Sequence, residues 1–160
     1  MRFTNRQLPQ IAHALLERAA RLNEAQNVDT AAVIALSGDL GVGKTTLVQE
    51  IAKELKVERL VPSPTFVIMR SYKATHPRFK RLVHIDAYRI ESKEELAPLK
   101  LKEVFNDPEA LVCVEWPERL FGALPLERIE LRLSIVGEYE REAISDPAVE
   151  DSLQKAIGVV

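Results

Sequence analysis

Apolar residues recur along this 160-residue chain with two different spacings, and each spacing predicts a different kind of element. Near the start they return every three to four positions, which predicts an amphipathic helix. Its buried stripe would consist of Leu8, Ile11, Ala12, Leu15, Ala19 and Leu22. Later, apolar residues form short unbroken runs over residues 30–37, 82–86 and 111–115. Such runs are typical of strands that are covered on both faces, as in a parallel sheet.

The order of these elements predicts an α/β fold. The run at 30–37 is followed by closely spaced glycines and then by residues 45–55, where apolar positions again have helical spacing. The remaining pattern predicts a strand over 65–72, one or two short helices over 92–105 divided at Pro98, an antiparallel hairpin of 128–136 and 139–145, and a helix over 147–157. We expect a single domain over residues 1–160, with a mostly parallel central sheet flanked by helices and a C-terminal antiparallel hairpin.

Composition narrows the class of protein. Hydrophobic residues make up 46% and charged residues 29%, with a net charge of −2, so a disordered or collagen-like chain is excluded. The longest apolar run, 31–36, is far shorter than the roughly 20 residues that span a bilayer. The one cysteine, Cys113, cannot form an internal disulfide, which fits a reducing compartment. We therefore expect a cytoplasmic protein.

The charge pattern leaves alternatives open at two places. Four arginines in the first 21 residues could belong to a mitochondrial transit peptide, but Glu17, Glu24 and the scarcity of serine favour an ordinary helix. Residues 59–85 hold six bases and no acids, whereas 138–151 hold six acids and one base. These stretches are either two solvated faces of opposite charge or a docking surface.

Half of the six glycines lie within six consecutive residues, and they form part of a recognisable motif. The sequence Gly38-Asp39-Leu40-Gly41-Val42-Gly43-Lys44-Thr45 matches the pattern G-x-x-x-x-G-K-[ST] of a phosphate-binding loop, between a predicted strand and a predicted helix. Glycine lets the backbone wrap a phosphate with its N–H groups pointing inward, and the following helix offers its positive N-terminus. Lys44 would reach the β- and γ-phosphates, and the Thr45 hydroxyl would coordinate Mg²⁺. The expected fold is therefore P-loop NTPase-like.

A magnesium site of this kind also needs a carboxylate, usually at the end of a neighbouring buried strand. Glu115 closes the run at 111–115 and is the first candidate, and Asp86, which closes 82–86, is the second. Both could serve, one near the metal and one polarising the attacking water. His84 is interpreted as a packed histidine, and Trp116 either covers the nucleotide site or fills core space.

Five motifs together resemble the TsaE family, the bacterial ATPases of tRNA threonylcarbamoyladenosine biosynthesis. They occur in the family's order and spacing over nearly the whole chain, although Lys100 stands where family members often have glycine. The motifs are the glycine motif extended to Thr46, Ser63-Pro64-Thr65-Phe66, His84-Ile85-Asp86-Ala87-Tyr88-Arg89, Glu94-Glu95-Leu96 and Glu115-Trp116-Pro117-Glu118.

The resemblance implies an ATPase that docks on a TsaB and TsaD partner pair and supports threonylcarbamoyl transfer to tRNA, which it meets indirectly through that pair. It implies ATP and Mg²⁺ as cofactors, with Thr45 and Glu115 holding the metal and Lys44, Asp86 and Glu115 as catalytic residues. The implied nucleotide-binding residues are Asp39, Leu40, Gly41, Val42, Gly43, Lys44, Thr45, Thr46, Thr65 and Trp116.

Two other functions use the same loop. A small-molecule kinase would pass phosphate to a metabolite and would typically add a basic lid, for which residues 70–81 are the candidate. A nucleotide-gated binding module would bind without significant turnover. Guanine specificity is unsupported, because none of the four asparagines begins the N-K-x-D sequence of GTPases, so the expected nucleotide remains ATP.

Overall fold

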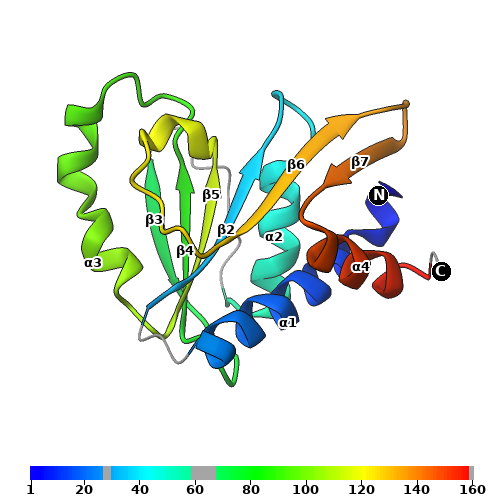
Figure 1. Cartoon of the computed structure of the whole chain (residues 1–160), viewed down its shortest axis with the longest axis horizontal. Helices are drawn as coiled ribbons and strands as arrows, with labels where there is room; N and C mark the ends of the chain where they lie inside the picture. The colour runs from blue at the N-terminus through cyan, green and yellow to red at the C-terminus, as the bar shows by residue number, and fades with distance from the viewer. Residues whose placement is uncertain (27–29, 59–67, 159–160) are drawn as a thin grey trace.

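The computed structural model describes residues 1–26, 30–58 and 68–158. Among these residues, seven strands form one sheet in the order β1-β7-β6-β2-β5-β4-β3 (Figure 1). The strands are β1 (Arg2–Thr4), β2 (Ala32–Ser37), β3 (Met69–Lys73), β4 (Arg81–Asp86), β5 (Ala110–Glu115), β6 (Ile129–Ile135) and β7 (Glu140–Ile144). The predicted α/β fold is therefore confirmed.

The sheet combines parallel strands at its centre with antiparallel strands at its edges. The four central strands β6, β2, β5 and β4 run parallel, whereas β3, β7 and β1 pair antiparallel at the two edges. Three of the six pairings are therefore parallel, which makes the sheet more mixed than the sequence predicted. The hairpin predicted at the C-terminus is present as β6 and β7, and a second one, β3 and β4, comes from another short connection.

The helices divide between the two faces of the sheet (Figure 1). One face is covered by α1 (Leu8–Gln26), α2 (Lys44–Glu54) and α4 (Pro147–Ala156), and the other by η2 (Lys93–Leu99), α3 (Leu101–Phe105) and η3 (Pro117–Leu120). A further 3-10 turn, η1 (Asn5–Gln7), leads into α1. Because β2, β4 and β5 lie between two layers, their side chains are buried on both faces, as the apolar runs predicted.

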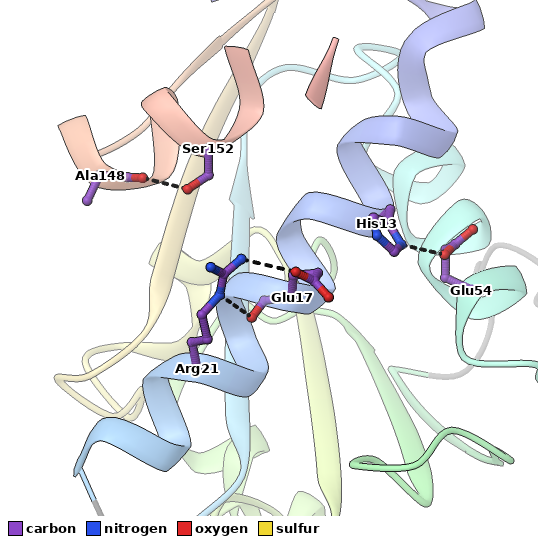
Figure 2. Close-up of polar contacts among 6 residues, drawn as sticks. All are labelled: His13, Glu17, Arg21, Glu54, Ala148 and Ser152. Carbon is purple, nitrogen blue, oxygen red and sulfur yellow. Dashed lines mark hydrogen bonds and ion pairs between the residues drawn. The ribbon is translucent and has the colours of Figure 1, made fainter. Parts of the chain in front are cut away.

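One polar contact joins α1 to α2 on the outer side, and two others lie within α1 and within α4. His13 Nδ1 of α1 lies 3.0 Å from Glu54 Oε2 of α2, and Arg21 pairs with Glu17 one turn earlier (Figure 2). In α4, the Ser152 hydroxyl donates to the Ala148 carbonyl. No helix among the described residues is both long enough and apolar enough to cross a membrane.

Two details of the sequence prediction need correction. The break in the predicted helix over 92–105 falls at Lys100, which takes the left-handed conformation (φ 48°), whereas Pro98 lies inside η2. Lysine adopts here a backbone conformation that glycine favours. Strand β1 was not predicted, because three residues are too few to show an alternating pattern. The start of the strand predicted over 65–72 lies outside the described residues, and β3 begins at Met69.

Candidate functional site

The glycine loop, residues 38–43, connects the end of β2 to the start of α2. Its three glycines have positive φ angles of 129°, 79° and 104°, a region that side chains disfavour. At Gly38 space is restricted as well, since a Cβ atom there would lie 2.1 Å from the Leu133 carbonyl oxygen of β6. The backbone of this loop can therefore take its path only with glycine at Gly38, and α2 begins directly after it at Lys44.

Lys44 places a buried ammonium group against this loop. The residue is 4% exposed, and Nζ donates to the carbonyl oxygens of Gly38 at 2.6 Å and Asp39 at 2.8 Å. Nζ also lies 4.1 Å from the centre of the Trp116 ring, a cation–π contact. Burial lowers the pKa of Lys44, while the carboxylates of Glu115 and Asp86 oppose that shift. A desolvated cation in this position strongly attracts an anionic ligand.

Thr45 and Glu115 meet next to Lys44. The Thr45 hydroxyl lies 2.8 Å from Glu115 Oε1 and 3.0 Å from Oε2, so its proton is shared between the two carboxylate oxygens. Glu115 is the last residue of β5 and only 3% exposed. It is brought here because β5 runs parallel to β2, with Glu115 opposite Leu36 and thus at the strand end that leads into the glycine loop.

Asp86 lies at the same edge of the sheet, opposite Glu115 in the pairing of β4 with β5. Its Oδ1 accepts a hydrogen bond of 3.1 Å from the Tyr88 backbone N–H. Burial raises the pKa of Asp86, and the nearby negative charge of Glu115 adds to the increase, while His84 and Lys44 counteract it. The two strand-end acids that the sequence offered as candidates therefore lie side by side in the structure.

His84 is a part of this site whose contact the sequence did not predict. The side chain is fully buried in β4, as expected for a packed histidine, but Nε2 lies 2.8 Å from Glu115 Oε1. A signal for this contact existed in the sequence, since His84 and Asp86 are two residues apart and share one face of the strand. The register of β4 against β5, which decides the partner, is not encoded in either strand alone.

Trp116 packs against the core, which is one of the two roles predicted for it, and it also lies against Lys44. Its half-buried ring packs against the core cluster around η3 and also contacts Lys44 and the Tyr88 ring, whose centre is 5.2 Å away. The backbone at Trp116 is left-handed (φ 59°), and its N–H donates to the Leu36 carbonyl at 3.2 Å. This conformation turns the chain sharply after β5 and leaves the indole over the ammonium group.

The other predicted nucleotide-binding residues differ in what their side chains do. Val42 is buried in the core below α2, so only its backbone is available to a ligand. Leu40 is 74% exposed, and Asp39, Gly41 and Thr46 are exposed as well. Thr65 lies outside the described residues.

The comparison with protein families identifies what this chain is related to. Residues 8–143 match the model described as "Threonylcarbamoyl adenosine biosynthesis protein TsaE". The chain belongs to the TsaE family. The family was named above from five motifs, and the resemblance is confirmed over a span that includes the glycine loop and Glu115.

Individual members of the TsaE family are similar to this chain at moderate identity. The tRNA threonylcarbamoyladenosine biosynthesis protein TsaE of Bacillus subtilis (strain 168) is 38% identical over 110 residues, which are 69% of this chain and 66% of that protein. The protein of the same name from Rickettsia bellii (strain RML369-C) is 36% identical over 110 residues, covering 68% of this chain and 73% of that one. The alignments thus span about two thirds of these relatives.

A solved structure supports the fold assignment. The crystal structure of Bacillus subtilis YdiB superposes with a TM-score of 0.65 at 25% identity, over 98% of this chain and 91% of that one. The similarity of fold to that structure therefore covers nearly all of the sequence.

Proposed function

We propose that this TsaE family member binds Mg·ATP at the glycine loop and hydrolyses it, slowly on its own, in support of threonylcarbamoyl transfer to tRNA. The observation that carries the proposal is the convergence of the Lys44 ammonium, the Thr45 hydroxyl and the Glu115 carboxylate beside the loop. These are the three side-chain types by which such a loop handles a nucleotide and its metal.

The donor set fits a triphosphate and a magnesium ion. Mg²⁺ prefers oxygen ligands and is usually held by one or two carboxylates together with substrate phosphates. Thr45 and Glu115, whose oxygens are already 2.8 Å apart, would supply the protein ligands. Nζ of Lys44 donates to two loop carbonyls, and a phosphate oxygen is a stronger, charged acceptor that would compete for those N–H bonds.

We assign the chemistry to the chain's residues as follows. Lys44 would orient the β- and γ-phosphates and offset the charge that develops on them, while the bound metal would supply Lewis-acid charge at the same oxygens. Asp86 would accept a hydrogen bond from the attacking water, a role that suits its raised pKa because a more basic carboxylate is a better proton acceptor. The Trp116 ring would cover Lys44 and limit access of bulk water.

The biological context of the proposal comes from the relatives, which carry the name tRNA threonylcarbamoyladenosine biosynthesis protein. We propose that the chain acts as one domain in the cytoplasm, that it docks on a TsaB and TsaD type complex, and that it meets tRNA through that complex. For the kinase alternative, the candidate basic lid runs between the two ends of β4: Arg81 pairs with Asp107 at the amino end, away from the glycine loop, whereas Arg70 lies opposite His84 near the carboxyl end. The metabolite arm of the assay below therefore decides this alternative.

An ATPase assay tests the proposal directly. Phosphate release should require Mg²⁺, should be slow for the chain alone, and should rise when the TsaB and TsaD partners and tRNA are all present. Stimulation by a metabolite mixture without partner proteins would favour a kinase instead, and nucleotide binding without turnover in any mixture would favour a binding module.

Replacing Glu115 separates the metal role from nucleotide binding. We expect Glu115→Ala to lose most Mg²⁺-dependent hydrolysis, on the order of 100-fold or more, while binding ATP with a smaller change. Glu103→Ala, which removes an exposed carboxylate on α3, is the matched control and should behave like the parent. An unchanged magnesium dependence in Glu115→Ala would transfer the metal role to Asp86.

A further inference from the structure

His84 occupies a buried position directly behind the candidate metal ligand Glu115. Leu82, His84 and Asp86 alternate onto one face of β4, the face that packs under α2 with Cys113 of β5. His84 lies opposite Cys113 of β5, which is two residues before Glu115 and on the same face of the sheet. From there Nε2 reaches Glu115 Oε1 at 2.8 Å.

The chemistry of the two groups fixes the direction of this hydrogen bond. An ionised carboxylate has no proton to give, so Nε2 of His84 carries the hydrogen and donates it. The other ring nitrogen, Nδ1, is buried and has no hydrogen-bond partner among the described residues. A leucine would fill the same space without burying an unpaired nitrogen. Packing alone therefore does not account for histidine here, whereas the bond to Glu115 does.

The bond constrains how Glu115 presents its oxygens. Oε1 accepts from both His84 Nε2 and Thr45 Oγ1, each at 2.8 Å, while the contact of Oε2 with Thr45 is longer, at 3.0 Å. A carboxylate held at one oxygen by a rigid, buried imidazole cannot rotate freely about its terminal bond. Oε2 therefore remains the oxygen that is more available to a cation next to the Thr45 hydroxyl.

The geometry points to His84 as a positioning residue that holds the Glu115 carboxylate for magnesium. It acts through Glu115 and touches neither metal nor nucleotide. The inference rests on the proposed function, since it assumes that Thr45 and Glu115 hold Mg²⁺. Partners that orient metal ligands in this way typically change metal affinity by 10–100-fold when removed.

Two substitutions separate the hydrogen bond from the space that the ring fills. His84→Leu removes the donor, and His84→Gln places an amide N–H near the position of Nε2. We would measure binding of the ATP analogue adenylyl imidodiphosphate by calorimetry, in EDTA and over a series of MgCl₂ concentrations. We expect His84→Leu to need about 10–100-fold more Mg²⁺ for the same increase in analogue affinity, with binding in EDTA unchanged. His84→Gln should restore most of the Mg²⁺ affinity that His84→Leu loses.

A packing control and a direct probe of the ring complete the test. Leu82→Ala opens a cavity on the same face of β4. If Leu82→Ala raises the Mg²⁺ requirement as much as His84→Leu does, the effect comes from packing and the inference is overturned. Nitrogen-15 NMR of the imidazole in the free parent protein should show hydrogen on Nε2 of His84, and hydrogen on Nδ1 alone would also overturn it. This second readout holds even if His84→Leu fails to fold.

Failure of the proposed function is distinguishable from failure of this inference. If the parent protein does not bind the analogue, or gains nothing from Mg²⁺, the nucleotide and metal assignment is wrong, and the role of His84 toward the metal is refuted with it. If the parent responds to Mg²⁺ and His84→Leu responds identically, the proposed function stands and the positioning role of His84 is refuted.

Discussion

The two ends of the parallel strands treat polar and charged side chains in opposite ways. At the carboxyl ends, Lys44, His84 and Glu115 are buried and contact one another or the glycine loop. At the amino ends of β4 and β5, Arg81 and Asp107 form an ion pair that is partly exposed to solvent. Burying a charge is unfavourable unless neighbours compensate, whereas an exposed pair contributes little in either direction.

This difference indicates where the fold accepts an energetic penalty. The exposed end could exchange one charged residue for another with small effect. The buried end could not, because its groups compensate one another: Lys44 donates to two loop carbonyls, and Glu115 accepts hydrogen bonds from Thr45 and His84. Ligands of open α/β sheets bind at the carboxyl ends of strands, so the buried charges coincide with the edge where a ligand is expected.

Lys44→Ala should produce the largest effect and would test whether the buried end is built for an anion. Removal of the ammonium should lower nucleotide affinity by about 100-fold or more, since a buried charged partner is lost. Lys53→Ala on the same helix is the control, because that lysine is exposed and forms a surface ion pair with Glu50. If calorimetry shows that Lys44→Ala and the parent bind ATP equally tightly, the assignment of the nucleotide site to the glycine loop is wrong.

Gly38→Ala should produce the next largest effect, on stability. A methyl group there would lie 2.1 Å from the Leu133 backbone oxygen at a φ of 129°, so the loop or β6 must shift. We expect a loss of about 2–4 kcal/mol in the free energy of unfolding, measured with urea. Gly41→Ala is the control, because its φ is also positive (79°) but no atom lies within 4 Å of the added methyl. Equal losses in the two variants would show that the contact with β6 is unimportant.

The contrast between the two ends also explains how far the sequence could predict this site. The glycine loop, Lys44 and Thr45 are contiguous, and Glu115 and Asp86 each close an apolar run, so local patterns revealed them. The bond between His84 and Glu115 depends on the pairing of β4 with β5, which sets residues 31 positions apart side by side. A pattern within one strand contains no information on that register.

The same limit applies to parts of the fold. The apolar runs predicted β2, β4 and β5, because burial on both faces leaves a signature within each strand. Strand β1 exists through its pairing with β7, and its three residues carry no periodic pattern. The break at Lys100 escaped prediction because proline is the stronger local signal, although Pro98 is tolerated in the last turn of η2.

His76→Asn should produce the smallest effect and would test the exposed end. His76 lies in the connection between β3 and β4, where Nδ1 accepts from the backbone N–H groups of Arg78 at 3.2 Å and Phe79 at 3.4 Å. Partial burial lowers the pKa of His76, and the positive charges of Lys56 and Lys80 lower it further. Protonation would abolish both accepted hydrogen bonds.

The sign of the pH effect follows from that lowered pKa. The unfolded chain takes up the proton first, near pH 6.5, so stability that is present above this pH is lost as the pH falls toward the pKa of the folded state. An asparagine oxygen can accept the same N–H groups without titrating. We therefore expect urea unfolding at pH 7.5 and 5.5 to show a smaller loss of stability for His76→Asn than for the parent. Lys80→Ala should lie between the two, because it removes one of the charges that lower the pKa of His76, and an identical pH dependence in all three proteins would contradict the assignment.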